Sequence, residues 1–217
     1  MRLIKFSYRC PVYFMPSLLL LFLTAVAENY TWDTAPDPGI QSGSGVWSDK
    51  SNRWTLDGIT LSTWAGAGNS ASFTGNDGTR RITVSGSLSV DSITFLSGGY
   101  IVQSGSFLTA PKVYVAANKY DTITTEVSGT SPLIKSGNGC LVLSGKNSYT
   151  GPTIINSGTI RFLSIDSGGK PSSIGSSSSD AANIVIKGGN LEYTYSGIDA
   201  ATDRLFTIGS DRCSLNV

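Results

Sequence analysis

Histidine is absent from the 217 residues of this chain, and charged residues make up only 14% of it. The lack of histidine excludes catalytic triads that depend on it, zinc sites with histidine ligands, and acid–base catalysis by imidazole. Basic residues are also few. Removing the three at the N-terminus with the signal peptide described below lowers Lys and Arg from 16 to 13, against 15 Asp and Glu, a net charge of −2. No nucleic-acid partner is therefore predicted.

Helical patterns are lacking as well. From Thr31 onward, no window repeats apolar residues at three- and four-residue spacing between helix caps, whereas short alternating runs recur throughout. Hairpin dipeptides are few, since Asp57-Gly58 and Asp77-Gly78 both lie in the N-terminal region. Short strands without helices fit either a β-sandwich or a β-helix, and the shortage of hairpin signals favours the β-helix.

Cysteine is scarce too, with three residues in the chain. Cys10 precedes the apolar run of the N-terminus, which is the wrong place for the acylated cysteine of a lipoprotein. Cys140 and Cys213 remain after export, and an oxidising compartment allows a disulfide between them. The alternative is two unpaired surface thiols, because strand alternation places Cys140 on the opposite face from Leu141 and Leu143.

Residues 1–27 have the three parts of a secretory signal peptide. Basic residues come first, an apolar run follows at 18–23, and Ala-Val-Ala at 25–27 supplies the small residues of a cleavage site. The apolar run is too short for a membrane-spanning helix, which needs about 20 residues. We therefore expect export to the periplasm, the cell surface or the medium, with no membrane span in the mature chain.

The predicted strands are short and rich in β-branched and aromatic residues. They are 82–84, 88–90, 92–95, 100–102, 112–115, 122–125, 141–143, 153–155, 159–162, 183–186 and 191–193. Ser-Gly pairs punctuate this part of the chain, at 85–86, 97–98, 104–105, 128–129, 136–137, 144–145, 157–158 and 196–197. Because glycine adopts positive φ without steric cost, the recurring pair predicts a corner that the chain turns repeatedly.

Three short strands with their corners need roughly 20–25 residues per coil, which predicts about six coils from Thr79 onward. The chain is therefore divided into the signal peptide (1–27), an N-terminal cap region (28–78) and β-helix coils (79–217). The cap region contains all four tryptophans, Trp32, Trp47, Trp54 and Trp64. Buried packing within the cap is the favoured interpretation, and stacking of sugars on exposed indole rings is the alternative.

Residues 167–180 break the pattern, because this Gly/Ser-rich run holds almost nothing that a core could bury. Strand patterning resumes at Asn183 in the same style, which argues against a linker between two domains. The run is therefore predicted to be a loop extruded from one coil.

Residues 135–162 carry the most specific motif in the chain, KSGNGCLVLSGKNSYTGPTIINSGTIRF. This stretch resembles the autotransporter-associated β-strand repeat, whose pattern is K-x-G-x-G-x-L-x-L-S-G-x-N-x-Y-x-G-x-T-x-I-x-x-G-x-L. Ile160 stands in the final leucine position. Looser similarity covers residues 70–95, which resemble the usual lead-in to such repeats, and 203–209, which resemble a segment that follows them.

Within the motif, the predicted core residues are Leu141, Leu143, Ile155 and Ile160, and the predicted corners are Gly145, Gly151 and Gly158. Asn147 is interpreted as a turn former. The alternative is an internal amide that bonds to the backbone of adjacent coils. The resemblance implies a right-handed parallel β-helix from the passenger region of a large secreted or surface protein, and it implies no catalytic residues.

Passengers of this family commonly continue through further coils to a sorting segment, whereas this chain stops at Val217 after a strand-like run. We therefore expect a C-terminally truncated passenger, or one that depends on another chain for translocation. An uncapped last coil would present unpaired N–H and C=O groups, which predicts self-association at that end.

The acidic residues of the coil region show no recurrent spacing; they include Asp91, Asp121, Glu126, Asp166, Asp180, Glu192, Asp199 and Asp203. We interpret them as solvated surface charge, since polysaccharide-cleaving β-helices need paired carboxylates or a calcium site. No catalytic, cofactor-binding or metal-binding residues are predicted, and no enzyme. The predicted function is a structural passenger or stalk segment that supports adhesion, with surface glycans or another surface protein as partner. The alternative is a β-helix that binds or processes carbohydrate.

Overall fold

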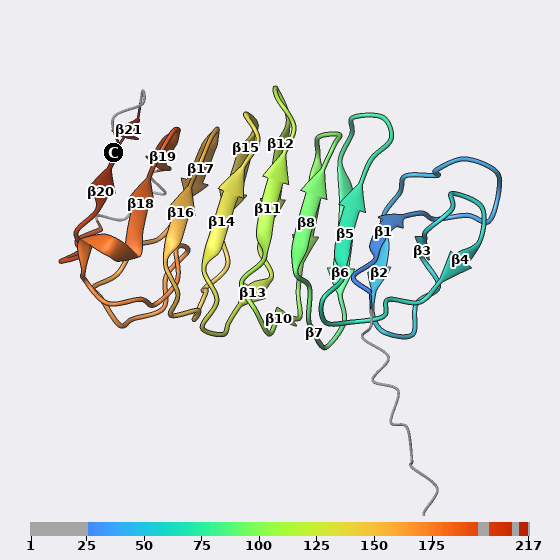
Figure 1. Cartoon of the computed structure of the whole chain (residues 1–217), viewed down its shortest axis with the longest axis horizontal. Coiled ribbons are helices and arrows are strands. Elements are labelled where there is room, and N and C mark those ends of the chain that lie inside the picture. The colour runs from blue at the N-terminus through green and yellow to red at the C-terminus, as the bar shows by residue number, and fades with distance from the viewer. Residues whose placement is uncertain (1–25, 195–199, 210–212, 217) are drawn as a thin grey trace, which may run out of the picture.

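The computed structural model describes residues 26–194, 200–209 and 213–216. In this part of the chain, strands stack in successive coils along one long axis and form a parallel β-solenoid (Figure 1). The all-β class and the β-helix architecture predicted from the strand pattern are confirmed. The expected signal peptide lies almost entirely outside the described residues, as do the Ser-Gly pair 196–197 and Asp199. No helix in the described ranges has the length and apolar character needed to cross a membrane.

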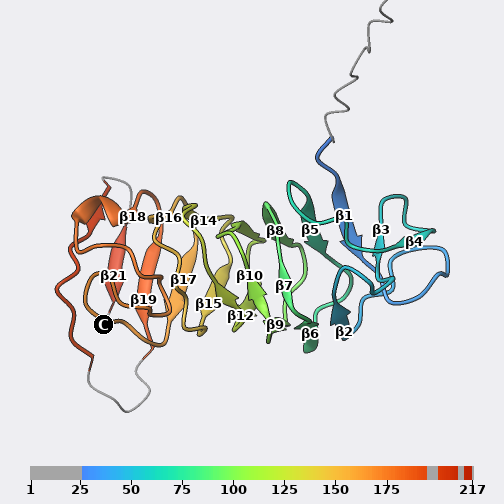
Figure 2. The ribbon, with the colours of Figure 1, turned by 90° about the horizontal axis from the view of Figure 1, so that it is seen from below.

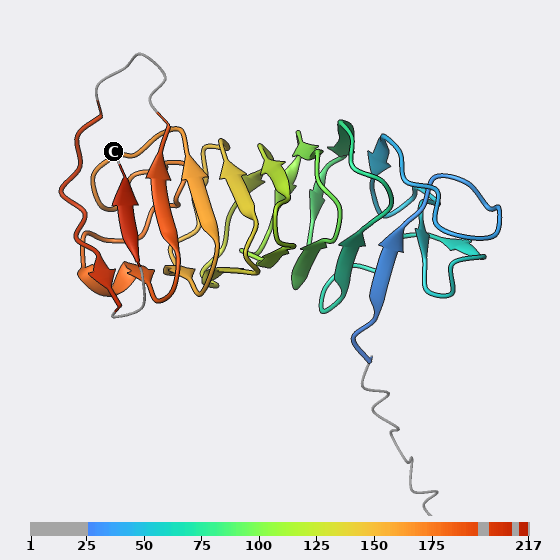
Figure 3. The ribbon, with the colours of Figure 1, turned by 90° about the horizontal axis from the view of Figure 1, so that it is seen from above.

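Three sheets form the walls of the solenoid. The ten-stranded sheet contains β1 (Asn29–Trp32), β3 (Trp54–Thr55), β4 (Leu61–Ser62), β5 (Ser70–Phe73), β8 (Ser92–Phe95), β11 (Lys112–Val115), β14 (Leu133–Ser136), β16 (Thr153–Ile155), β18 (Ile184–Ile186) and β20 (Thr207–Ile208). The eight-stranded sheet contains β2 (Gly45–Trp47), β6 (Arg80–Val84), β9 (Tyr100–Gln103), β12 (Tyr120–Ile123), β15 (Cys140–Leu143), β17 (Thr159–Phe162), β19 (Asn190–Tyr193) and β21 (Ser214–Asn216). The three-stranded sheet contains β7 (Ser87–Leu88), β10 (Ser106–Phe107) and β13 (Glu126–Val127). Both large sheets run along the long axis (Figures 2 and 3). The described helical content is one 3₁₀ turn, η1 (Ala181–Asn183).

Sheet register gives the length of each coil. Ser92 pairs in parallel with both Ser70 and Lys112, so these two coils take 22 and 20 residues. Thr153 pairs with Ile184, which makes that coil 31 residues long because it includes the Gly/Ser-rich run. The described chain completes about six turns.

The core lies between the sheets, and strand alternation supplies it. In β11, Val113 and Val115 are buried while Lys112 and Tyr114 are exposed. Parallel pairing then stacks inward side chains of successive coils in columns, and burial of each aliphatic side chain contributes about 1.5–3 kcal/mol. The four core residues predicted within the repeat motif are all fully buried: Leu141, Leu143, Ile155 and Ile160.

Parallel pairing already begins within the region that the sequence marks as the cap. β1 pairs in parallel with β5, and β2 pairs in parallel with β6. Beyond β1, the chain reverses, since β3 lies antiparallel to both β1 and β4 at the N-terminal end of the stack (Figure 1). Asp57-Gly58 lies in the β3–β4 connection, and the φ of Gly58 is +74°. The division at 78/79 therefore stays a prediction, but one antiparallel pair, β3 with β4, does lie at the hairpin dipeptide Asp57-Gly58, whereas Asp77-Gly78 joins two strands of different sheets.

The four indole rings fill the interior of this end, and all of them are buried. Trp47 lies at the centre, with ring centroids 4.9 Å from Trp54 and 5.1 Å from Trp64. The indole N–H of Trp32 donates to Gly43 O at 2.9 Å, and that of Trp64 donates to Ser89 O at 3.0 Å. The packing interpretation is confirmed, and no tryptophan ring is available as a sugar platform.

Two physical reasons account for the corner glycines of the repeat. Gly158 has a φ of +71°, which is the left-handed conformation expected from the Ser-Gly punctuation. Gly151 meets a different requirement, since a Cβ there would lie 2.3 Å from Ser131 O of the preceding coil. Glycine at that position therefore permits close stacking of the coils.

Candidate functional site

Four buried polar side chains lie in the repeat coils and the segment after them, and three of them bind backbone groups of neighbouring coils. Lys135, Asn147, Tyr149 and Arg204 are all buried, although polar and charged residues are normally exposed. Because an unpaired buried polar group is costly, their partners show what each one does. We refer to these four side chains as the polar set.

Lys135 points into the core from β14, in the column between Val113 and Ile155. Its ammonium donates to Ser136 O and Gly137 O, both at 2.7 Å, and to Ser157 O of the next coil at 3.3 Å. Burial lowers the pKa of Lys135 to about 8, so the group remains cationic at neutral pH. The first lysine of the motif therefore joins two coils through backbone carbonyls.

Asn147 corrects a sequence interpretation. Its Oδ1 accepts from Val127 N at 2.9 Å, and its Nδ2 donates to Ser173 O at 2.7 Å. The side chain is fully buried and bonds one coil on each side of its own. The turn-former interpretation was therefore wrong, and the alternative of an internal amide between coils is what the structure shows. A single copy of the motif holds one asparagine at this position, so a ladder through successive coils could not be recognised from it.

The Gly/Ser-rich run also differs from its prediction as an extruded loop. Residues 172–177 are all buried, and Ile174 is completely enclosed. Ser172 N donates to Asn147 O at 3.2 Å, while Ser176 N donates to Tyr149 O at 2.8 Å. Serine hydroxyls bond to nearby groups as well, including Ser176 Oγ to Ser148 O at 2.7 Å. The prediction failed because apolar content alone does not show that small polar residues can be buried when their hydrogen bonds are satisfied.

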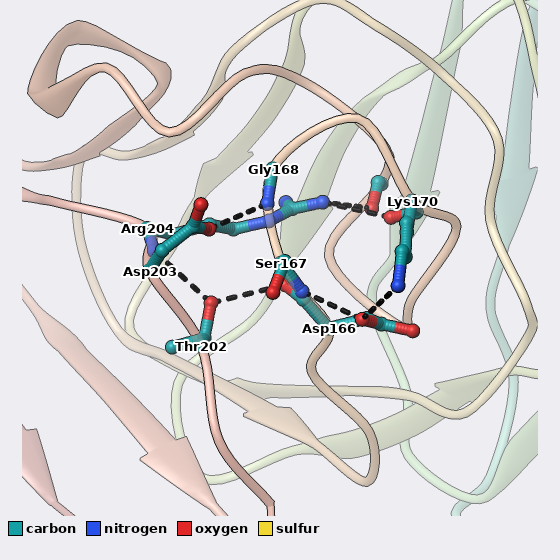
Figure 4. A network of polar contacts seen from close by, with 8 residues as sticks. Asp166, Ser167, Gly168, Lys170, Thr202, Asp203 and Arg204 are labelled. Carbon is teal, nitrogen blue, oxygen red and sulfur yellow. Dashed lines mark hydrogen bonds and ion pairs between the residues drawn. The ribbon is translucent and has the colours of Figure 1, made fainter.

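Arg204 holds this run from the C-terminal side. Its Nη2 donates to Lys170 O and Gly175 O, both at 2.9 Å, and burial lowers the pKa of the guanidinium. Neighbouring groups tie the two segments together: Thr202 Oγ1 donates to Asp166 O at 3.0 Å, and Gly168 N donates to Asp203 Oδ1 at 2.7 Å (Figure 4). Sequence reasoning did not identify Arg204 as important, although it lies in the 203–209 segment that resembles the family.

Tyr149 completes the polar set. Its ring is fully buried, and its hydroxyl lies 2.6 Å from Thr153 Oγ1. Burial raises the pKa of the phenol well above its usual range, so it stays neutral. Thr153 Oγ1 in turn lies 3.3 Å from Ile174 O, which extends the polar contacts to the buried run.

Asp121 is a second correction, because it is not solvated surface charge. It lies in β12 with 1% of its surface exposed, in the inward column next to Leu141. Its Oδ1 accepts from Tyr100 N at 2.9 Å. Burial raises the pKa of this carboxyl to about 7, and the nearby Asp77 adds to the rise while Lys119 opposes it.

The other acids are engaged separately along the surface. Asp91 pairs with Lys112 at 3.3 Å, Asp166 with Lys170 at 3.9 Å, and Glu192 with Arg161 at 2.6 Å. Glu126 accepts from Ser148, Asp180 from Ser178, and Asp203 from Gly168. Within the described ranges, no three His, Cys, Asp or Glu residues gather as they would around a metal ion.

The cysteines form no disulfide with each other. Cys140 is a buried free thiol at the start of β15, and burial raises its pKa. The prediction of a surface thiol was therefore wrong for Cys140. Cys213 is half-buried, and its thiol donates to Ile186 O at 3.3 Å.

The interior near the last described coils is less completely filled. An apolar cavity of about 540 Å³ is lined there by residues that include Phe162, Leu191, Phe206 and Leu215. Leu205, Phe206 and Ile208 are exposed close by. Self-association at this end stays a prediction.

The polar set has a definite chemical character. Lys135, Asn147 and Arg204 bind backbone groups of neighbouring coils, and Tyr149 bonds to the Thr153 hydroxyl of its own coil. None of the four is paired with a second reactive group in the manner of a catalytic acid and base. The arrangement holds coils in register. The fold and these contacts define a parallel β-solenoid with a polar, internally bonded repeat.

Comparison with known proteins agrees with that class. The passenger-associated-transport-repeat family matches residues 133–162. The chain is also 39% identical over 122 residues to the adhesin BmaC autotransporter of Brucella suis biovar 1 (strain 1330). That match covers 55% of this chain but 4% of the adhesin. No solved structure matches the chain significantly.

The chain therefore carries an autotransporter passenger repeat, and the resemblance found in residues 135–162 is confirmed. The matched range contains Lys135, Asn147 and Tyr149, so three of the four members of the polar set lie in the repeat itself. Arg204 lies outside it and acts on the run that follows.

Proposed function

We propose that this chain is a structural passenger segment of an exported autotransporter-like protein, and that it supports adhesion at a cell surface. The observation that carries the proposal is the repeat, in which Lys135 and Asn147 bond adjacent coils through the interior. Such a device lengthens and stiffens a solenoid without supplying chemistry. The adhesin relative supports the surface role, although this chain corresponds to only 4% of that protein.

The proposal includes export through residues 1–27, a position in the periplasm, on the cell surface or in the medium, and no enzymatic activity. Partners at the surface would be glycans or another surface protein. The domain limits of 28–78 for the cap and 79–217 for the coils belong to the same proposal.

Expression of the full chain in a Gram-negative host tests it. We expect the mature protein to begin at Glu28. Protease treatment of intact cells, of spheroplasts and of the culture medium should locate the folded chain outside the inner membrane. Retention in the cytoplasm with residues 1–27 still attached would contradict export. Release of reducing ends from polysaccharides by the purified chain would favour the carbohydrate-processing alternative instead.

A further inference from the structure

Tyr120 is the most exposed aromatic side chain in the described structure, with 58% of its surface accessible. It stands at the start of β12, directly after a turn in which Asn118 adopts a φ of +60°. A buried aromatic ring stabilises the core, whereas this ring contributes little burial. Packing in the core therefore does not explain an aromatic residue at this position, and the surface around the ring suggests a binding role.

The ring stands between two hollows in the surface. One, of about 290 Å³, is lined by Asp77, Thr79, Asn118, Lys119 and three glycines. The other, of about 110 Å³, lies towards the next coil and is lined by residues that include Asn138, Gly139 and Thr159. Both hollows share Asn118, Lys119 and Tyr120. The lining glycines let successive coils pack closely beneath the hollows, because a Cβ at Gly99 would lie 2.3 Å from Gly78 O and one at Gly139 would lie 2.2 Å from Ala116 O.

Two ion pairs lie beside the ring. Lys119 Nζ lies 2.6 Å from Asp77 Oδ2, and Arg161 Nε lies 2.6 Å from Glu192 Oε2. The Arg161 guanidinium carbon lies 5.7 Å from the centroid of the Tyr120 ring. Asp77 also accepts from Gly98 N at 2.8 Å. These contacts hold the side chains around the ring in place, so an ionic ligand would have to compete with both ion pairs. Arg80, a further cation beside the first hollow, donates to Gly78 O at 3.2 Å.

We propose that Tyr120 and the two hollows form a binding site for a neutral pyranose, the terminal sugar of a surface glycan. The apolar C–H face of a pyranose packs on an aromatic face, and its hydroxyls need planar donors and acceptors at the edge of the ring. The exposed amides of Asn118 and Asn138 and the Asp77 carboxylate supply those groups. This inference rests on the proposed adhesive function and names its partner.

A protein partner fits the same surface less well. A stable protein interface buries about 800 Å² on each side around an apolar centre. Here polar residues surround a single aromatic ring, and the hollows have the size of small ligand sites or less. The sugar is therefore the better match in both size and chemistry.

Nuclear magnetic resonance of the ¹⁵N-labelled mature chain provides the test. The probes are methyl glycosides of glucose, galactose and mannose, with glucuronic acid and sialic acid as charged comparisons. We expect at least one neutral glycoside to shift the amide signals of Asn118, Tyr120 and Gly139, with a Kd of about 1 mM or weaker. The charged sugars should bind more weakly.

Variants locate the effect. Tyr120→Ala should weaken binding about tenfold or more, and Tyr120→Phe should retain it. Tyr114→Ala is the matched control, because Tyr114 is 41% exposed but lies in β11 of the other large sheet. Absence of shifts at 50 mM of every neutral glycoside, shifts confined to another surface, or equal loss in Tyr114→Ala would overturn the site. Cells that still adhere through the Tyr120→Ala chain would reject this site while leaving the proposed adhesive function intact.

Discussion

The N-terminal end and the repeat coils of the described stack fill their interiors in opposite ways. The N-terminal end encloses Trp47 among Trp54, Trp64 and Phe107, so the interior is filled by rings. The coils around the repeat instead enclose a lysine and an asparagine, each bonded to backbone of adjacent coils. Aromatic filling relies on area removed from water and tolerates small shifts of one coil against the next. Directional hydrogen bonds do not tolerate such shifts, so the polar set fixes the register of one coil against the next.

The largest expected effect is loss of the central indole at the N-terminal end. Trp47→Ala should destabilise by about 4 kcal/mol, because it leaves a cavity beneath four other rings. Urea unfolding followed by hydrogen exchange measures both size and place, and exchange should rise most in β2, β5 and β6. Val46→Ala, at an exposed position of β2, should change stability little. Equal effects of the two substitutions on stability would contradict the stabilising role of aromatic packing at the N-terminal end.

Removal of the buried ammonium should have the next largest effect. Lys135→Met keeps the apolar stem but leaves three carbonyl groups without their donor, at a cost of about 3 kcal/mol. Lys146→Met, an exposed lysine of the same motif, is the control and should be nearly neutral. A Lys135→Met chain as stable as the wild type would show that hydrophobic filling serves equally well in the repeat.

A substitution at Asn147 tests whether the donor and the acceptor of the buried amide are both needed. Asn147→Asp keeps the acceptor for Val127 N but replaces the donor to Ser173 O with a carboxylate, so a loss of about 2 kcal/mol is expected. Hydrogen exchange should increase at residues 172–177, where the Gly/Ser-rich run depends on that bond. Asn156→Asp, at an exposed position, should leave these amides protected. Unchanged protection in Asn147→Asp would mean that the backbone contacts of the run and those from Arg204 hold it without this bond.

The smallest expected effect lies between the two regions, at Asp121. Its pKa of about 7 exceeds the ordinary value of 3.8, so between these values the folded chain holds a proton that the unfolded chain has released. Stability should therefore fall as pH rises from about 4 to 7, and level off above that. Asp121→Asn should abolish most of this slope and stabilise the chain at pH 8 by roughly 1–2 kcal/mol. A parallel pH profile for wild type and variant would show that Asp121 is not the titrating group.

Strand positions were largely predictable because alternation and Ser-Gly punctuation are local signals. Residues 92–95, 112–115, 153–155 and 159–162 form strands with the predicted limits. The inward positions of the repeat followed from the same alternation, and the spacing of a coil followed from strand and corner length. These features depend on residues that are close in the sequence, so they can be predicted from a single amino-acid sequence.

The polar contacts were not predictable in this way, because each depends on which coil lies above and below. Asn147 meets Val127 and Ser173, which are 20 and 26 residues away in the chain. Arg204 meets Gly175 from a distance of 29 residues. Asp121 follows the inward alternation of its strand, yet its charge alone suggested the surface.

The sequence by itself determined an all-β chain with strands, corners and one passenger repeat, because those properties rest on composition, alternation and motif, whereas export stays a prediction. Only the tertiary structure decided that the four tryptophans meet in one cluster, that residues 172–177 of the Gly/Ser-rich run are buried, and that Tyr120 stands exposed between two hollows. Stacking places residues about 20 positions apart in contact, and the resulting hydrogen bonds determine which polar side chains enter the core.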